Sequence, residues 1–417
     1  MDSALTAGAA AQAIDGGASL DLGAKLIIVL GGILSALALT AISSVLPLID
    51  HDLARTPQDS LLVKQLIGGV GLAMVAGSAL SGFLVDRFGL RLTMMAASLV
   101  YVVSGTAGLY LSDLWLLLGS RLLLGFAAAC IQIACLTLVN TRLAGEQRAR
   151  WMGLHISAAL FGTIAVHPIA GNLGELSWRY PFGLYVLGVV LLAGASTSRS
   201  AVFGRRPRPP RAMSANPRMP RLGWPSWFPF HYLALGLMIG SVVFLPSVYL
   251  PFLLRGFGAS PSTISYVMTA DSIAGAGMAL LYGAARRHLS VHAAFIASFT
   301  VLAAGTLFAL QARGLAGVIV GMVIYGFGVG WLVPNLITSI GEKVDTRHQG
   351  RATGFVKAAH FLAAPVGVAV MEPVARVHGP RAALATVALI SISVVLLMAM
   401  RMVQRLRRPA PRLPTIR

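Results

Sequence analysis

Three ionisable side chains interrupt long apolar runs of this chain, where a charge is costly unless it is used. Asp271 is predicted to be the only carboxyl group deep inside such a run, and His167 and Arg121 lie inside two others. An ionisable group in an apolar environment is a functional hypothesis by default, and the simplest chemistry for a carboxyl group or an imidazole is uptake and release of a proton. The alternatives are a structural ion pair or a solvated acid for Asp271, and side chains bonded to the backbone for His167 and Arg121.

Other chemistry is not indicated by the sequence. The motifs HExxH and GxSxG and paired carboxylates are absent at the ends of the apolar runs, and no phosphate-binding loop of the form GxxxxGK(S/T) occurs. Cys130 and Cys135 share one run with no second pair, which argues against a disulfide framework and a zinc site. We therefore expect no enzymatic activity, no metal and no cofactor.

The composition indicates that lipid surrounds most of the chain. Hydrophobic residues make up 56% of the 417 residues, charged residues 11%, and the mean hydropathy is +0.78. This leaves too little polar surface to cover a water-soluble protein of this size. The net charge of +19 lies mainly in short connections between apolar runs, which is typical of membrane insertion rather than of nucleic-acid binding.

Twelve runs are long enough to cross a membrane, since a helix needs about 20 apolar residues to span the hydrocarbon core. The predicted fold class is an all-α membrane protein with twelve transmembrane helices in two pseudo-symmetric six-helix bundles. The runs cover residues 24–49, 61–84, 91–111, 115–140, 151–173, 181–197, 229–253, 263–284, 291–311, 315–340, 353–371 and 380–401.

The basic residues are divided unevenly between the two sides of the membrane. If both termini lie on one side, that side collects most of the 33 lysines and arginines, including seven arginines from Arg199 to Arg221. The opposite side carries Arg55, Arg179, Arg255, Arg313, Arg376 and Arg381. Positive residues favour the cytoplasmic side, so both termini are predicted to be cytoplasmic and the number of crossings to be even.

A polar segment divides the runs into two sets of six. Residues 198–226 are rich in arginine and proline and have no acidic residue. A shift of 201 residues relates Gly82 to Gly283, Gly125 to Gly326, and Arg150 to Arg351. The shared shift indicates two similar halves. The predicted parts are a disordered cytoplasmic tail (1–23), an N-terminal six-helix bundle (24–197), a cytoplasmic linker (198–228), a C-terminal six-helix bundle (229–403) and a basic cytoplasmic tail (404–417).

The connection after the second run carries a compact charged motif. Its residues are Gly82, Leu84, Asp86, Arg87, Gly89 and Arg91. They resemble the pattern G-x-L-x-D-R-x-G-x-R, which joins the second and third helices of the major facilitator superfamily. The resemblance implies that the motif controls conformation: Asp86 would face a helix start near Gly354 in the other half and favour the outward-facing state. A solvated loop charge is the alternative.

The fifth run resembles a degraded version of the family's antiporter pattern, which ends G-P-x-x-G-G. Pro168 and Gly171 fit this helix-packing motif, while His167 and Asn172 replace glycines. The turn over residues 177–182 resembles the exporter-type pattern W-R-x-x-F. Together they favour the export branch of the family.

The resemblance also implies roles for the ionisable residues. Arg121 begins the pattern R-x-x-x-G of the fourth helix, which implies an influence on proton binding. The fifth and eighth helices pack together in this fold, and His167 and Asp271 would lie at depths that differ by about 3 Å at about 1.5 Å per residue. We hypothesise that His167 and Asp271 form a protonation-linked pair.

A mostly apolar cavity with a few polar or aromatic groups suits amphipathic ligands. The candidates for its lining are Gln132, Trp331, Asn335 and His360.

The resemblance implies a secondary transporter of the bacterial inner membrane that works by alternating access. We expect proton-coupled efflux of a small amphipathic compound or metabolite by a monomer whose partners are the substrate, protons and the bilayer, with no nucleic acid. Proton-coupled uptake of a small organic metabolite is the main alternative. A non-transporting sensor or scaffold and a membrane-embedded enzyme are the others.

Overall fold

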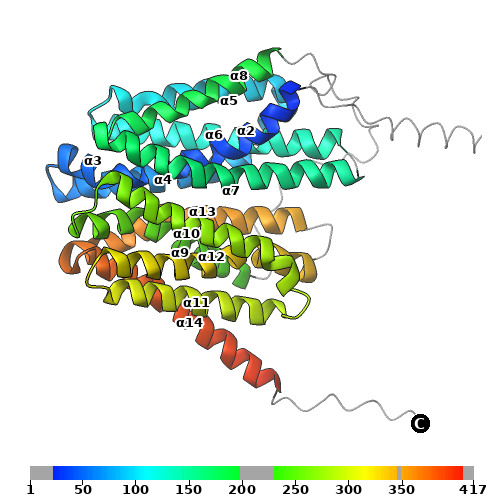
Figure 1. The fold of residues 1–417 in the computed structure, drawn as a ribbon. Coiled ribbons are helices and arrows are strands. Elements are labelled where there is room, and N and C mark those ends of the chain that lie inside the picture. The colour runs from blue at the N-terminus through cyan, green and yellow to red at the C-terminus, as the bar shows by residue number, and fades with distance from the viewer. Residues whose placement is uncertain (1–21, 144, 198–229, 345–348, 407–417) are drawn as a thin grey trace, which may run out of the picture. The chain divides into compact units, whose positions relative to one another are not determined.

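The computed structural model describes residues 22–143, 145–197, 230–344 and 349–406. The predicted linker over residues 198–228 lies outside the described residues, as do residues 1–21 and 407–417 of the two predicted tails. Within the described ranges every regular element is a helix (Figure 1).

The helices follow one another along the chain with short connections. They are α2 (Leu22–Thr40), η1 (Ser43–Val45), α3 (Leu46–Leu53), α4 (Pro57–Phe88), α5 (Leu90–Gly105), η2 (Thr106–Leu109), α6 (Leu114–Arg142), α7 (Gly145–Leu176), η3 (Tyr180–Leu187), α8 (Gly188–Thr197), α9 (His231–Gly256), α10 (Pro261–Ala285), α11 (Val291–Gln311), α12 (Leu315–Lys343), α13 (Gln349–His378) and α14 (Pro380–Leu406).

Twelve stretches of the described chain are helical, long and apolar enough to cross a membrane, and each coincides with one of the twelve predicted runs. The prediction of twelve spans is confirmed. Helices suit this setting because all their backbone hydrogen bonds close within the segment, so lipid meets no unpaired polar backbone. Several ends were predicted too short: α4 begins at Pro57 rather than 61, α7 begins at Gly145 rather than 151, and α13 continues to His378 rather than ending at 371.

The chain divides by its contacts into two compact units. Unit 1 comprises residues 1–42, 69–166 and 179–225, and unit 2 comprises residues 43–68, 167–178 and 226–417. The first part of α4 and the last part of α7 therefore belong by their contacts to unit 2, although both precede the linker. The predicted division into two six-helix bundles stays a prediction.

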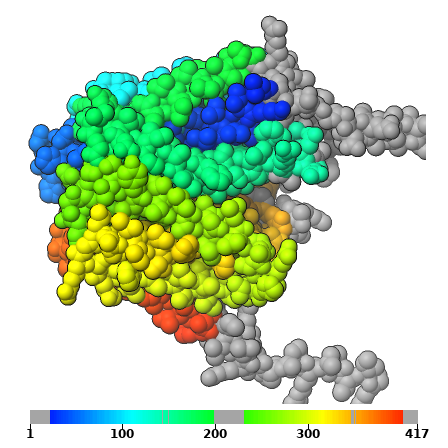
Figure 2. All heavy atoms as spheres, in the orientation of Figure 1, coloured from blue at the N-terminus to red at the C-terminus, as the bar shows by residue number. Residues whose placement is uncertain are grey.

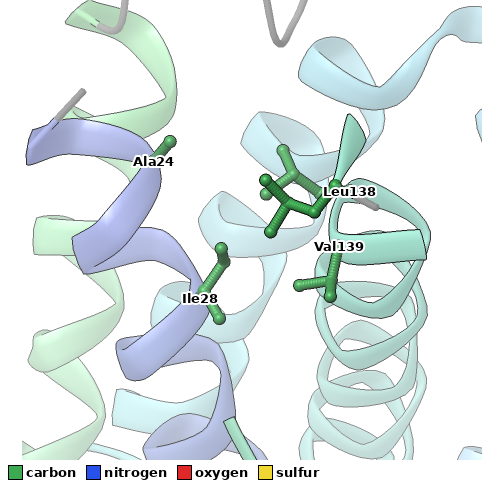
Figure 3. Packing of buried hydrophobic residues seen from close by; sticks show 5 residues of the cluster. Ala24, Ile28, Leu138 and Val139 are labelled. Atoms are coloured by element: carbon green, nitrogen blue, oxygen red, sulfur yellow. The ribbon is translucent and has the colours of Figure 1, made fainter. Parts of the chain in front are cut away.

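One buried apolar cluster of unit 1 lies between α2 and α6. Ala24 and Ile28 on α2 pack with Leu138 and Val139 on α6 (Figure 3), and Leu143 completes this buried cluster.

In unit 2 the helices approach closely at glycines, as is common between membrane helices. A β-carbon at Gly330 of α12 would lie 2.8 Å from Cβ of Met278 on α10, and one at Gly328 would lie 2.6 Å from the backbone nitrogen of Leu302 on α11. The outer surface is apolar: Leu307 and Phe308 are exposed on α11, which is yellow on the face shown in Figure 2. Such a surface is suited to contact with lipid tails.

Candidate functional site

Asp271 lies in the middle of α10, where that helix packs against α12. Its side chain is half-buried. A β-carbon at Gly326 on α12 would lie 2.8 Å from its Oδ1 atom, so the glycine provides the space for the carboxyl group. No hydrogen bond or ion pair reaches this carboxylate from the residues that the structure describes. An acid in this position can bind a proton without competition from a paired cation.

His167 lies in α7, in the same unit, and is 3% exposed. Its Nδ1 atom has no hydrogen-bond partner within the described ranges. A β-carbon at Gly171 of α7 would overlap Ser265 of α10, so the two helices are in close contact one turn away. The predicted contact between α7 and α10 is therefore present.

The predicted pairing of His167 with Asp271 is not formed in this structure, because no hydrogen bond or ion pair joins them in the described part of the chain. The reason is rotation about α10. Asp271 follows Ser265 by six residues, which at about 3.6 residues per turn directs the two side chains about 120° apart. Ser265 faces α7, whereas Asp271 faces Gly326 on α12.

The antiporter-like segment of α7 is fitted closely to α10. Gly171 leaves room for Ser265, and Asn172 donates to the Pro168 carbonyl at 2.8 Å and to the Tyr266 hydroxyl at 3.1 Å. Pro168 lies inside α7 and removes one backbone donor from it. The two residues that departed from the family pattern, His167 and Asn172, therefore both occupy positions close to this contact.

Arg121 is fully buried in unit 1. Its Nη2 atom donates to the carbonyls of Ser104 at 3.2 Å and Gly105 at 2.8 Å, at the end of α5. Its guanidinium lies 4.7 Å from the centre of the Phe182 ring and 5.0 Å from that of Tyr185. Carbonyls at a helix end attract a cation, and aromatic faces add to that attraction. This is the arrangement expected of an arginine bonded to the backbone.

The charged motif after α4 forms a tight connection. Gly89 has φ +85° and separates α4 from α5 by a single residue, a conformation that glycine adopts without strain. Asp86 and Arg87 are exposed. Arg91 donates from Nε to the Ala195 carbonyl at 2.9 Å and from Nη2 to that of Ser196, so it caps the end of α8. The predicted role of Gly82, Asp86 and the rest of the motif in conformational control stays a prediction.

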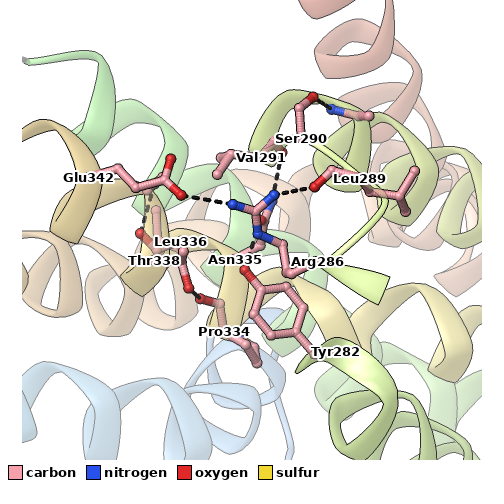
Figure 4. Close-up of polar contacts among 12 residues, drawn as sticks. Tyr282, Arg286, Leu289, Ser290, Val291, Pro334, Asn335, Leu336, Thr338 and Glu342 are labelled. Atoms are coloured by element: carbon pink, nitrogen blue, oxygen red, sulfur yellow. Dashed lines mark hydrogen bonds and ion pairs between the residues drawn. The ribbon is translucent and has the colours of Figure 1, made fainter. Parts of the chain in front are cut away.

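Two of the predicted cavity residues use their polar atoms to hold helices together. Asn335 is fully buried, accepts from the Tyr282 hydroxyl at 3.0 Å and donates to the Val291 carbonyl at 2.9 Å, which joins α10, α11 and α12. The same region contains the ion pair between Arg286 and Glu342, at 2.7 Å (Figure 4).

Trp331 donates its indole N–H to the Met278 carbonyl at 2.7 Å. His360 is half-buried, with its ring 5.2 Å from that of Phe244, and Gln132 is half-buried on α6. The Trp331 donor is thus used between helices, while His360 and Gln132 stay candidates for contact with a substrate.

The sequence analysis missed an acidic residue. Glu372 is 1% exposed within α13 and directly follows the predicted run over residues 353–371, so it was not considered. Glu372 Oε1 lies 2.9 Å from Lys64 Nζ on α4 and 3.2 Å from Arg376 Nε. Arg376 was predicted to lie in a connection between helices, but it lies inside α13. The sequence did contain a signal for this acid: Lys64 interrupts the predicted run 61–84, and a lysine inside such a run needs a buried counter-charge.

No group of three or more metal-ligating side chains that could hold a metal ion occurs among the described residues.

Comparison with known proteins places the chain in a family. A family model described as the Major Facilitator Superfamily matches residues 28–255 and 232–416. The class C tetracycline resistance protein of Escherichia coli is 27% identical over 370 residues, covering 82% of this chain and 87% of that protein. Solute carrier family 2, facilitated glucose transporter member 10, of Xenopus tropicalis is 28% identical over 163 residues, and this match spans only 28% of that protein's length.

Solved structures show the same fold. A D-xylose-proton symporter matches with a TM-score of 0.72 at 16% identity, covering 90% of this chain and 96% of that one. The nucleoside transporter NupG matches with a TM-score of 0.74 at 14% identity, covering 91% and 98%. Likeness at these identities concerns the fold alone. Because the family model matches well over half of the residues and the twelve-span helical fold agrees with it, the chain belongs to the Major Facilitator Superfamily, a family of membrane transporters rather than enzymes.

Proposed function

We propose that this protein is a secondary transporter that couples the export of a small amphipathic compound or metabolite to protons by alternating access. The observation that carries the proposal is the position of Asp271, a half-buried carboxyl group in mid-helix that no cation pairs with among the described residues. Intramembrane carboxyl groups mark ion pathways in transporters, and each proton supplies about 2.3 kcal/mol per 100 mV of membrane potential.

Export is supported by a relative that aligns with most of the chain, a tetracycline resistance protein. A transporter that gives resistance to a drug lowers the amount of that drug inside the cell. The resemblance of Pro168 and Gly171 to the family's antiporter pattern agrees with this direction.

Proton-coupled uptake of a small organic metabolite is the second candidate. It is favoured by the fold likeness to a D-xylose-proton symporter and by the incomplete antiporter pattern at His167 and Asn172.

We further propose that the protein acts as a monomer in the bacterial inner membrane, with both termini in the cytoplasm and two six-helix bundles around the substrate. The excess of arginine and lysine on the side of the termini supports this orientation.

Proton flux in proteoliposomes tests the function. The purified protein is reconstituted with a pH-sensitive dye inside, and a panel of amphiphiles and organic acids is screened for substrate-dependent proton movement. We expect Asp271→Asn to abolish this movement and Glu146→Gln, which changes an exposed acid at the start of α7, to leave it intact. Undiminished flux in Asp271→Asn would exclude Asp271 as the coupling residue.

Vesicle orientation tests the direction. Right-side-out vesicles should expel the substrate and everted vesicles should accumulate it, whereas uptake predicts the reverse. A protein that moves neither substrate nor protons under any condition of the panel would instead match a sensor or scaffold.

A further inference from the structure

A lysine inside the eleventh span has no charged partner on the protein. Lys357 lies in α13, six residues after Arg351, where the apolar stretch of that helix begins. Its side chain is exposed, and no hydrogen bond or ion pair reaches it from the residues that the structure describes. A charge inside a membrane span is costly unless it is used, so Lys357 requires either water or an anion.

Lys357 is turned away from lipid. At about 100° per residue, Phe355 and Leu362 project from α13 at about 160° and about 140° from Lys357, both on the far side of the helix. They are 42% and 38% exposed, and Val366, which is 41% exposed, continues this apolar stripe. An exposed apolar stripe suits acyl chains. The opposite face, which carries Lys357, is therefore the one on which a polar solute can meet α13.

His360 provides a second polar group on this face. It follows Lys357 by three residues, so the two side chains are neighbours on α13. The imidazole is half-buried, and neither of its ring nitrogens takes part in a hydrogen bond within the described ranges. An imidazole carries an N–H donor in either tautomer. An ammonium group and an N–H donor side by side suit the oxygens of a carboxylate, sulfonate or phosphate.

Aromatic rings form a wall beside these two groups. The His360 ring centre lies 5.2 Å from that of Phe244 on α9 and 5.6 Å from that of Phe361, and the two phenylalanine rings are 6.2 Å apart. Phe244 is 7% exposed, whereas Phe361 is half-buried and presents part of its ring. Phe361 also follows Lys357 by four residues, on the same face of α13. An apolar ligand body can therefore contact Phe361 while its charged end lies at Lys357.

The helices behind this wall are in close contact. A β-carbon at Gly240 of α9 would overlap the His360 carbonyl oxygen and lie 2.6 Å from Cβ of Ala363. A β-carbon at Gly236 would lie 2.8 Å from the Val356 carbonyl oxygen. The backbones of α9 and α13 thus nearly touch on both sides of Lys357, which fixes the rings in place. A preformed site loses little conformational entropy when it binds a ligand.

The acidic side chains of the neighbouring helices have other cations. On α13, Glu372 lies about 22 Å along the helix from Lys357 and pairs with Lys64 and Arg376. Glu342 of α12 pairs with Arg286, and α9 contains no acidic residue. A counter-charge for Lys357 must therefore come from outside these three helices, and a ligand can supply it.

We propose that Lys357 and His360 form the anion-binding part of the substrate site, so that the transported compound is an amphipathic organic anion. Lys357 Nζ attracts the carboxylate, sulfonate or phosphate group, the His360 imidazole donates a hydrogen bond to it, and Phe361 contacts the apolar body. This role rests on the proposed transport function and adds the charge of the substrate to it.

Direct binding tests the preference for anions without transport. The full-length protein in phosphatidylcholine nanodiscs is dialysed against diphenylacetate, diphenylmethanesulfonate or diphenyl phosphate, and against diphenylacetamide as the neutral counterpart. Empty nanodiscs measure partition into lipid. We expect at least one of the anions to bind about tenfold or more tightly than diphenylacetamide, because hydrogen bonds to charged groups are strong. Binding of every anion no tighter than that of the amide would overturn the proposal.

Variants locate the binding site. Lys357→Gln should weaken anion binding about tenfold or more and change amide binding by less than about twofold, and His360→Phe, which keeps a ring beside Phe244, should weaken anion binding about fivefold. Lys357→Arg keeps the charge and should keep the preference for anions. Since the Lys357 side chain is exposed, these variants should unfold at the wild-type temperature.

Lys343→Gln is the matched control. It removes an exposed lysine at the end of α12 and changes the net charge equally, but should leave anion binding unchanged. An equal loss in Lys343→Gln and Lys357→Gln would indicate general electrostatic attraction and overturn the proposal, as would an undiminished preference for anions in Lys357→Gln.

The outcome can be separated from that of the proposed function. Anion binding that requires Lys357, in a protein that moves no protons with any compound of the panel, would support the anion site and reject proton-coupled transport. Proton-coupled movement of a neutral or cationic compound that is unchanged in Lys357→Gln would support transport and reject the anion site.

Discussion

A β-carbon at position 326 would lie 2.8 Å from Oδ1 of Asp271, so the absence of a side chain on α12 creates the space that the α10 carboxyl group occupies. The same β-carbon would also press on the Asp271 backbone carbonyl, which cannot rotate away. The position of the proposed coupling acid therefore depends on Gly326.

Gly326→Ala should move Asp271 and weaken the packing of α10 on α12. We expect proton flux to fall by about tenfold or more, because small displacements of a reacting group are costly, and stability to fall by about 1 to 3 kcal/mol from overpacking. Flux in proteoliposomes and thermal unfolding of the purified protein measure the two effects. Gly341→Ala on the same helix, where a β-carbon would meet nothing within 4 Å, is the control and should change neither. Wild-type flux in Gly326→Ala would mean that the close contact is irrelevant to coupling.

Arg121→Lys distinguishes a structural arginine from one that takes part in proton binding. Lysine keeps the charge but lacks the planar guanidinium that lies between Phe182, Tyr185 and the carbonyls at the end of α5. We expect unfolding at lower temperature, with a loss of about 2 kcal/mol or more, and an unchanged pH dependence of the transport that remains. A shifted pH profile in a variant of normal stability would instead support the role in proton binding implied by the family pattern.

Gly171→Ala should weaken the contact between α7 and α10, because its β-carbon would overlap Ser265 and lie 2.7 Å from the Pro261 carbonyl. We expect a loss of about 1 to 3 kcal/mol of stability in thermal unfolding. Adding Ser265→Ala removes the hydroxyl and should recover part of that loss. On the same helix Gly153→Ala meets nothing within 4 Å and should be neutral or gain up to about 1 kcal/mol, since alanine favours helix. If Gly171→Ala and Gly153→Ala changed the stability equally, the close contact at Gly171 would be refuted.

The membrane-spanning helices could be predicted from the sequence because the length of an apolar run is a local property. All twelve appear where the runs predicted them. The place of Asp271 along its helix could be predicted for the same reason. Its direction could not, since the rotation of α10 is set by close contacts at Gly326 and Ser265 that lie far away in sequence.

The partners of buried charges were harder to predict. The cost of burying Arg121 indicated that something binds it, but its partners come from the end of α5 and from η3 through tertiary packing. Glu372 follows a predicted run by a single residue, so an error in one helix end concealed it. Helix ends are the least certain part of such predictions, and a charged pair at a helix end is easily missed.

The boundaries between the two units coincide with glycine and proline residues inside α4 and α7. α4 passes from unit 2 to unit 1 between Gly68 and Gly69, and α7 passes from unit 1 to unit 2 between Val166 and His167, directly before Pro168. Paired glycines and internal prolines are where helices bend most readily. We therefore expect α4 to bend most readily at Gly68 and Gly69, and α7 to bend most readily at Pro168.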